Sequence, residues 1–522
     1  MAILVIWMAA LALRVPHLDE RPMHTDEAVQ AMKTDILWRT GKYVYDPEEY
    51  HGPTLYYLTL PFLWLSGQQQ LVDVDAVTFR MVPVLFGAGL VLLLWLIRDG
   101  LGRWACTWAA VYTAISPAMV FYSRYYIQET LLVFFTFLAV VAAYRYFRSG
   151  WIGWSLLVGA CLGLMHATKE TWVIAVGAML AAALLTILWT HWVDDRRINW
   201  QPWIRPKVKA RALIFGWAVS TLLFSAFFTN PRGPLDSVLT YTTYLERGGG
   251  ESEHNHPWNY YLSTLLLSKS GPIIWSEALI VVMSVVGMVL ALWHRGIGRA
   301  HLSFVRFVTF YTLIMIVVYS AISYKTPWCM LGFLHGMILL AGFGTVALVR
   351  ILPGIPLKIV ASLVLIVASA QLGKQAYAAN FGRLAFHPRN PYVYAHPNRD
   401  VVELEERLAD ISQVAPQGDE MLVAVFAPEE FNYWPLPWYL RRFTNVGYWH
   451  DLEAPEVPAP ALQAPVVIVA PEFQEAFDQR NQGKYYFEGR GLRPGVVIGV
   501  NIRSDLWQAF LKERAKASPS GE

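Results

Sequence analysis

The sequence predicts a polytopic α-helical membrane protein of about eleven spans followed by a C-terminal extracytoplasmic α/β domain. Of the 522 residues 55% are hydrophobic and 16% are charged, and the mean hydropathy is +0.35. This composition excludes an ordinary soluble protein. Apolar windows of spanning length recur as far as residue 372. From residue 373 onward prolines, charges and short β-like runs replace them.

The spans are predicted from windows of apolar residues, because about 20 such residues cross a hydrocarbon layer of roughly 30 Å. The first window is short. It lacks a basic n-region and a small-x-small cleavage site before Arg14, so we expect an uncleaved first helix whose natural start can lie further upstream. The windows fall at residues 1–18, 74–98, 104–121, 127–147, 151–167, 172–190, 211–229, 272–294, 303–323, 329–349 and 357–372.

Basic residues predict the orientation of these spans. Arginine and lysine mark the connections after every second window, and the positive-inside rule assigns such connections to the cytoplasm. They are Arg98 with Arg103, Arg145 with Arg148, the run 196–211, Arg295 with Arg299, and Arg350 with Lys358. The remaining connections are then expected outside, namely residues 19–73, 122–126, 167–171, 230–271, 323–328 and everything after 373.

Two domains are expected from this organisation. Residues 1–372 form the transmembrane domain, and residues 373–522 form the soluble α/β domain. Within the second domain the runs 421–427 and 464–470 are typical of strands. The stretch YWPLPWYLRR at 433–442 suits stacking on a sugar or docking on the membrane surface, or else an aromatic anchoring helix.

Several classes of partner and site are not expected. The net charge of +3 is not gathered into a basic stripe, so nucleic acid is not an expected partner. Cys106, Cys161 and Cys329 lie in apolar runs, which indicates core residues instead of disulfides or metal ligands. No phosphate-binding or dinucleotide fingerprint is present, because the glycines of GFGTVALV at 342–349 lie inside an apolar window and indicate helix packing.

The first outer loop carries an acidic motif. Asp26 and Glu27 precede an amphipathic stretch that is expected to lie along the membrane interface. Thr25 before them equally suits a helix start whose acidic first turn complements the helix dipole. Further along, Gly52 and Pro53 interrupt the chain before an aromatic segment that is too short to span.

The other outer connections add charged and polar residues. Arg124 lies in a short connection, and Glu129 enters the next helix, where a carboxylate faces either a cavity or a partner such as Arg124. Lys169 and Lys325 lie at outer junctions and either extend to the interface or hold a phosphate. His254 and His256 favour a polar or substrate contact over a metal site.

A glycine run, 248–250, would let the long outer loop move as a lid. Five separated connections therefore deliver carboxylates, cations and histidines to one predicted side of the membrane. A shared cavity is the economical explanation.

The order of these motifs resembles the GT-C superfamily of polyprenyl-phosphate-sugar-dependent glycosyltransferases, which includes the protein O-mannosyltransferases and the aminoarabinose transferase of lipid A. The resemblance covers nearly all of residues 1–372. It rests on the DEA motif at 26–28, HGPTLYY, FRMVPVLFG with Arg80, SPAMVFYSRYYIQE, the TKE at 168–170 and YKTPW at 324–328. HGPTLYY, TKETW, YKTPW, NPYVYAHP and YWPLPWYLRR are similar to a bacterial and archaeal branch known as flippase-activity-associated proteins of glycosylation pathways.

The resemblance implies roles for particular residues. Asp26 matches the first-loop aspartate that acts as a base or orients the acceptor, and Glu27 completes the motif. The aminoarabinose-transferase pattern has a second glutamate before Lys-Pro, where this chain has His51-Gly52-Pro53. That role falls to Glu48, Glu49 or His51, and we favour His51.

The remaining assignments follow from the chemistry of a lipid-phosphate donor. Arg124, Lys169 and Lys325 are expected to bind the donor phosphate, because cations stabilise the charge on the departing group. The expected substrate-binding residues are His24, Glu129, Glu170, His254 and His256. Metal dependence is left open, and a divalent ion would be held by Asp26, Glu27, Glu129 or the histidine pair.

The predicted activity is the transfer of a sugar from a polyprenyl-phosphate donor to a lipid, glycan or protein acceptor outside the cell inner membrane. One well-placed base favours inversion at the anomeric carbon. Two alternatives use similar residues. A flippase accessory would bind the lipid-linked sugar and move it intact, and an oligosaccharyltransferase-like enzyme would use a lipid diphosphate donor and transfer a whole glycan to a peptide.

Overall fold

The computed structural model describes residues 1–48, 51–195, 205–248 and 254–517. The chain divides into two compact units. The first comprises Met1–Leu18, Ile36–Leu65 and Val77–Tyr394, and the second comprises Asp19–Asp35, Ser66–Ala76 and Ala395–Glu522. The second unit therefore starts later than the predicted boundary at 372/373, and it also takes in part of the first outer loop.

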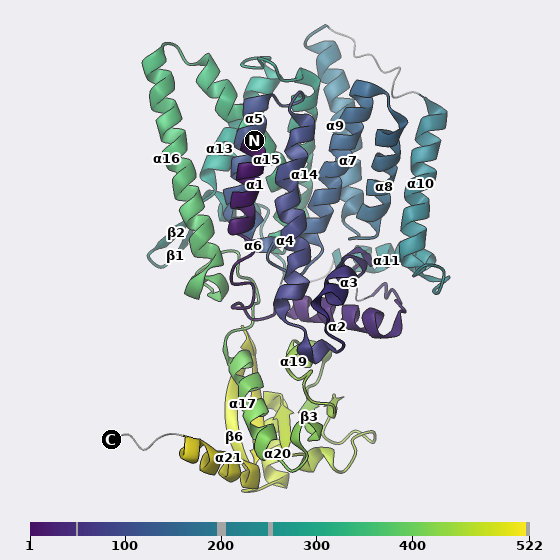
Figure 1. Cartoon of the computed structure of the whole chain (residues 1–522), viewed down its shortest axis with the longest axis vertical. Helices are drawn as coiled ribbons and strands as arrows, with labels where there is room; N and C mark the ends of the chain where they lie inside the picture. The colour runs from purple at the N-terminus through teal and green to yellow at the C-terminus, as the bar shows by residue number, and fades with distance from the viewer. Residues whose placement is uncertain (49–50, 196–204, 249–253, 518–522) are drawn as a thin grey trace. The chain divides into compact units, whose positions relative to one another are not determined.

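The first unit is a bundle of apolar helices (Figure 1). Each of the eleven predicted windows holds a helix, within the described residues. The helices are α1 (Ala2–Ala12), α4 (Ala76–Leu93), α5 (Arg103–Ile115), α7 (Glu129–Ser149), α8 (Ile152–His166), α9 (Trp172–Trp192), α10 (Pro206–Phe224), α13 (Ala278–Leu292), α14 (Leu302–Ala321), α15 (Leu331–Ile351) and α16 (Ile355–Asn380).

The number of membrane crossings is supported in part. In the described part of the chain six segments are long and apolar enough to cross a bilayer: Ala76–Ile97, Glu129–Ser149, Trp172–Trp192, Leu302–Ala321, Pro327–Ile351 and Ile355–Asn380. Helices α1, α8 and α13 are apolar but shorter. A predominantly helical membrane protein is thus confirmed, and the count of about eleven spans stays a prediction.

Glycines of α15 allow close helix packing in the bundle. A Cβ added to Gly342 would lie 2.5 Å from the carbonyl oxygen of Ala105 on α5, and one added to Gly344 would lie 2.1 Å from that of Met283 on α13. Real Cβ atoms do not approach so closely, so these two helix contacts require glycine. The prediction that this motif serves helix packing is confirmed.

The predicted basic connections meet at one end of the bundle. Asp99, between α4 and α5, pairs with Arg145 at 3.0 Å and with Arg148 at 3.6 Å near the end of α7. The amide of His301, before α14, donates to the carbonyl of Gly100 at 2.8 Å. Asp194, after α9, forms a further ion pair with Arg306 at the start of α14. The run 196–211 lies outside the described residues as far as 204.

The opposite end holds the short elements of the predicted outer loops. Helices α3 (Thr54–Ser66) and α11 (Gly233–Gly248) lie there (Figure 1). Between α11 and α13 follow α12 (Tyr260–Leu266) and a hairpin of β1 (Ser268–Ser270) and β2 (Ile273–Trp275). With 13 residues, α3 is too short to span, as predicted. Residues 249 and 250 of the predicted glycine lid lie outside the described residues.

The second unit contains a five-stranded sheet in the order β4-β3-β5-β7-β6. Strand β3 runs parallel to β4 and β5, whereas β7 is antiparallel to β5 and β6. The strands are β3 (Val423–Phe426), β4 (Val446–Trp449), β5 (Val466–Val469), β6 (Tyr485–Arg493) and β7 (Val496–Arg503). Strands β3 and β5 coincide with the two predicted runs.

Helices complete this α/β unit. They are α17 (Asp400–Val414), α18 (Glu430–Tyr433), α19 (Leu436–Tyr439), α20 (Pro471–Arg480) and α21 (Ser504–Ala517), together with the start of α2 (Thr25–Thr40). All four residues of β3 and of β5 are buried, which is typical of central strands covered on both faces. Of the three cysteines, all in the first unit, Cys106 and Cys161 are buried and Cys329 is partly buried.

Candidate functional site

The HGPT segment of the first unit packs against the connection between α8 and α9. The backbone amide of Thr54 donates to the carbonyl oxygen of Ala167 at 2.9 Å, and its hydroxyl donates to the same atom at 2.6 Å. A Cβ added to Gly52 would lie 2.2 Å from that oxygen. The glycine therefore permits a close backbone approach that brings His51 next to the TKE residues.

We expect Gly52→Ala to separate these two segments and to destabilise the protein. The added methyl meets backbone, which cannot move aside cheaply, so the cost is about 1–3 kcal/mol, as for overpacked cores. Thermal unfolding of the purified full chain measures this. Gly177→Ala on α9 is the matched control, because nothing lies within 4 Å of its added Cβ. Equal melting temperatures for both variants would contradict the close approach.

His51 and Glu170 form a hydrogen-bonded pair. Nδ1 of His51 lies 2.8 Å from Oε2 of Glu170, and the hydroxyl of Tyr45 donates to Oε1 at 3.1 Å. Burial raises the pKa of the Glu170 carboxyl, but the charge and hydrogen bond of His51 outweigh burial, so the pKa is lowered overall. An ionised Glu170 accepts the proton of Nδ1 and so fixes the tautomer and orientation of the His51 ring.

Lys169 and Glu129 form a buried ion pair. Burial lowers the pKa of Lys169, but the adjacent carboxylate of Glu129 outweighs it and raises the pKa overall. The alternative that Glu129 pairs with Arg124 is therefore wrong, because the lysine from the α8–α9 connection takes that place. Either charge would be costly to bury alone, so each member of this buried pair is stabilised by the other.

Arg124 serves a different purpose from the one expected. Its guanidinium donates to the carbonyl oxygens of Arg14, Pro16 and His17 at 2.8–3.0 Å and lies 4.7 Å from the ring centre of Phe381. These bonds hold the segment that follows α1. They use NH1 and NH2, the nitrogens that would grip a phosphate, so the geometry favours a structural role over phosphate binding.

Lys325 is a buried cation at a second outer connection. Only 1% of the residue is exposed, and burial lowers its pKa. Its ammonium donates to the carbonyl of Ile322 and, at 3.1 Å, to that of His256. It takes part in no ion pair with any residue that the structure describes. A buried ammonium held only by carbonyl oxygens is well suited to an anionic ligand.

His254 and His256 contact the connection that carries Lys325. Nδ1 of His254 lies 2.6 Å from the hydroxyl of Tyr394, and the ring of His256 stacks on Tyr260 with centroids 4.2 Å apart. The amide of Lys325 donates to the carbonyl of His254 at 2.8 Å. Among residues 1–48, 51–195, 205–248 and 254–517, no group of three His, Cys, Asp or Glu residues is arranged to hold a metal ion.

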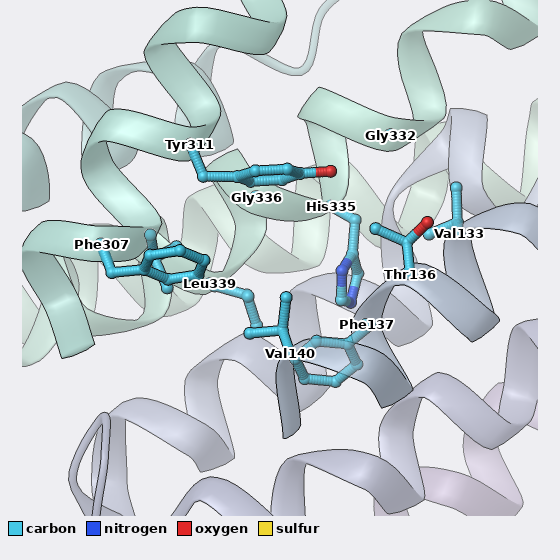
Figure 2. A pocket seen from close by; sticks show the side chains of 11 residues that line it. Val133, Thr136, Phe137, Val140, Phe307, Tyr311, Gly332, His335, Gly336 and Leu339 are labelled. Carbon is cyan, nitrogen blue, oxygen red and sulfur yellow. The ribbon is translucent and has the colours of Figure 1, made fainter. Parts of the chain in front are cut away.

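A small hollow lies next to Glu129, the partner of Lys169, and is lined by residues of α7, α9, α14 and α15. Its outer part is lined by Glu129 and Thr171 on one side and by Trp328 and Cys329 on the other. A second, mainly apolar hollow shares several lining residues with it and lies between α7, α14 and α15 (Figure 2). Tyr311 and His335 also line this deeper part (Figure 2). Both hollows are therefore walled mainly by apolar side chains, and Glu129 brings the charge of its pair with Lys169 to one of them.

The acidic motif lies in the second unit, at the start of α2. The amide of His24 donates to Oε2 of Glu27 at 3.0 Å, and the amide of Asp26 donates to Nδ1 of His24 at 3.1 Å. This is a reciprocal capping arrangement in which a histidine replaces the usual serine or threonine. The predicted helix start is thus confirmed. Glu27 is fully buried, whereas the side chain of Asp26 is 43% exposed.

One further prediction for the second unit concerns the aromatic stretch at residues 433–442. Trp438 and Tyr439 of the YWPLPWYLRR stretch are each 3% exposed, so they are not available for stacking on a sugar or for docking on a membrane.

Two residues of the first unit, Tyr45 and Tyr394, were not predicted as site residues. The sequence did carry a signal for Tyr394, because this residue belongs to the NPYVYAHP motif.

Comparison with known proteins places this arrangement in context. A family model for dolichyl-phosphate-mannose-protein mannosyltransferases matches residues 42–230. That range contains His51, Glu129, Lys169 and Glu170. No curated protein matches the chain.

Solved structures resemble the whole chain. ArnT from Cupriavidus metallidurans bound to undecaprenyl phosphate matches with a TM-score of 0.61 and 15% identity over 97% of this chain and 98% of that one. The oligosaccharyltransferase of Archaeoglobus fulgidus tethered with an acceptor peptide matches with a TM-score of 0.57 and 11% identity over 97% of this chain and 76% of that one. The predicted resemblance to the GT-C glycosyltransferases is confirmed by these folds and the family model.

Proposed function

We propose that this chain, which has the fold of the GT-C glycosyltransferases, is a membrane glycosyltransferase that moves a sugar from a polyprenyl-phosphate donor to an acceptor. The observation that carries the proposal is the likeness over the whole chain to a structure that binds undecaprenyl phosphate. The mannosyltransferase family model supports it from an independent comparison. The buried ion pair of Lys169 and Glu129, with Glu129 lining a mainly apolar hollow, is the local feature that supports it.

Asp26 is assigned to the acceptor. Its exposed carboxylate is free to orient or deprotonate a hydroxyl, which is the role of a general base in displacement at the anomeric carbon. Glu27 is reassigned from catalysis to positioning, because its buried carboxylate caps the helix that carries Asp26. His51, oriented by Glu170, is proposed as the second group that exchanges a proton.

Lys169 and Lys325 are assigned to the donor phosphate. Negative charge grows on the departing phosphate as the sugar leaves, and fixed cations in a site shielded from water stabilise that charge strongly. Glu129 holds Lys169 in place, and two carbonyl oxygens hold Lys325. His254 and His256 are proposed to contact the substrate beside Lys325.

Lys325→Ala is expected to weaken donor binding by about 10-fold to 100-fold, because a hydrogen bond to a charged group contributes roughly 1.5–3 kcal/mol. Titration of the full chain in nanodiscs with a short-chain polyprenyl-phosphate mannose measures the change. Lys269→Ala removes an equal charge from the exposed strand β1 and serves as the control. Unchanged affinity in the Lys325 variant would remove this lysine from the donor site.

The proposal includes a location and a domain organisation. We place the protein in the cell inner membrane with about eleven spans in its first unit, and we place the C-terminal α/β fold, from Ala395 onward, outside the cytoplasm. The clustering of basic connections at one end of the bundle supports this orientation.

Two other activities make different predictions. A flippase accessory would tolerate the loss of Asp26 as long as Lys169 and Lys325 remain. An oligosaccharyltransferase-like enzyme is favoured by the likeness to the archaeal structure, and it would require a lipid diphosphate donor and a peptide acceptor. Supplying monophosphate and diphosphate donors separately distinguishes these readings.

A further inference from the structure

The acidic motif and the C-terminal α/β fold belong to one compact unit. Residues 19–35 group with residues 395–522, although Asp35 and Ala395 are 360 positions apart in the sequence. A direct hydrogen bond joins the two parts, because the hydroxyl of Tyr439 lies 2.7 Å from the amide nitrogen of Met23 and accepts its proton. The ring of His396 lies against that of His24, with centroids 5.6 Å apart.

The residues next to Tyr439 are anchored to α17. Tyr439 ends α19, and its neighbour Trp438 is buried. Arg441 donates to the carbonyl of Trp438 at 2.7 Å, lies 4.0 Å from its ring centre and pairs with Glu405 on α17 at 3.2 Å. A chain of bonds thus runs from α17 through α19 to the amide of Met23.

His24 transmits that position to the acidic motif. Its Nδ1 accepts the proton of the Asp26 amide, so this nitrogen carries no proton, and its own amide donates to Glu27. On the other side, Nδ1 of His396 donates to the carbonyl of Pro397 at 2.8 Å. Burial, followed by the neighbouring His24 and Arg21, lowers the pKa of His396, so its ring is neutral and packs beside His24 without repulsion.

We propose that the C-terminal domain sets the position of the catalytic aspartate, with Tyr439, His396 and His24 as positioning residues that fix residues 23–26. The proposal rests on the function assigned to Asp26 above. It gives YWPLPWYLRR and NPYVYAHP a common purpose: each supplies one side chain, Tyr439 or His396, that contacts the loop bearing the motif. A displacement of about 1 Å in a reacting group can cost 100-fold in rate, so such a clamp matters for turnover more than for folding.

Hydrogen exchange in the full chain tests the clamp without reference to activity. In nanodiscs, Tyr439→Phe removes the hydroxyl that accepts from the Met23 amide, and the peptide covering residues 21–30 is expected to exchange about tenfold faster. Tyr485→Phe is the matched control, because its hydroxyl donates to the carbonyl of Ala464 at 2.9 Å within the same unit but away from the motif. Unchanged exchange at 21–30 in Tyr439→Phe would overturn the proposal.

Turnover of a polyprenyl-phosphate mannose provides the second readout. Tyr439→Phe should lower kcat about 10-fold to 100-fold and leave the KM for the donor unchanged. His24→Ala should do the same, whereas His24→Asn should restore turnover, since asparagine is among the best residues at a helix start. Failure of His24→Asn to recover more activity than His24→Ala would count against the capping step.

The outcome separates this inference from the proposed function. If Asp26→Asn is inactive and Tyr439→Phe turns over normally, only the positioning role is overturned. If Asp26→Asn is fully active, the assignment of the base fails, whatever the exchange data show. Faster exchange together with a fall in kcat alone supports both.

Discussion

Purified Asp26→Asn protein is expected to bind the polyprenyl-phosphate donor with unchanged affinity and to lose sugar transfer by about 100-fold to 10,000-fold, the usual contribution of a general base. The side chain of Asp26 is partly exposed and only its backbone takes part in capping. Asparagine keeps the size and helix-start preference of aspartate, so the fold should be unaffected. The loss would therefore be chemical.

A control variant tests whether the loss of any carboxylate from this loop lowers transfer. Asp19→Asn removes an exposed carboxylate from the same loop and should leave transfer unchanged. Donor binding and transfer are measured on the same preparation, so a fall in binding would reveal a structural effect. Undiminished transfer by Asp26→Asn would defeat the base assignment and favour the transport reading.

Breaking the Lys169–Glu129 pair is expected to have the second largest effect. Lys169→Met leaves Glu129 buried without a partner, and removal of one member of a buried ion pair costs about 3–5 kcal/mol. A large fall in the melting temperature should follow. In the double variant Lys169→Met with Glu129→Gln no charge remains buried, so most of that stability should return.

Activity separates the structural role of this pair from its proposed role. The double variant should stay inactive, because it folds but lacks the cation proposed to bind the phosphate. The matched control is the buried pair Arg306 and Asp194 at the other end of the bundle, whose double replacement by methionine and asparagine should leave transfer intact. Wild-type transfer by the Lys169 and Glu129 double variant would reduce Lys169 to a structural residue.

Much of the architecture could be predicted because membrane helices and central strands leave direct signatures. Each apolar window became a helix, and the runs around Val423–Phe426 and Val466–Val469 became adjacent strands. The division into units could not be predicted, because grouping of residues 19–35 with residues 395–522 depends on tertiary contacts such as that between Met23 and Tyr439. Hydropathy carries no information about such contacts.

The sequence predicted which residues belong to the candidate site, but it did not predict which of them pair with each other. Sequence reasoning selected Glu129, Lys169 and Glu170, but it left open whether Glu129 faces a cavity or pairs with Arg124. The fold instead brings Lys169 to Glu129 and His51 to Glu170. Partner choice across 40 or 119 positions is decided by helix packing, which single-sequence patterns do not encode.

Glu27 and Trp438 show that the burial of a side chain also could not be predicted from the sequence. Both residue types are typical of sites, an acidic motif for catalysis and a tryptophan for sugar binding. In the folded chain both side chains are buried, with Glu27 accepting from the amide at the start of α2 and Trp438 packing under Arg441. Exposure is a property of the folded chain and could not be read from either motif.

The central claim is that the protein breaks the bond between a sugar and a polyprenyl phosphate. The most direct test reconstitutes the full chain in proteoliposomes with polyprenyl-phosphate mannose labelled in the sugar, as the only donor, and a native membrane extract as the source of acceptor. We expect labelled acceptor and free polyprenyl phosphate to appear in equal amounts. Movement of the donor across the bilayer with the sugar still attached would contradict the claim.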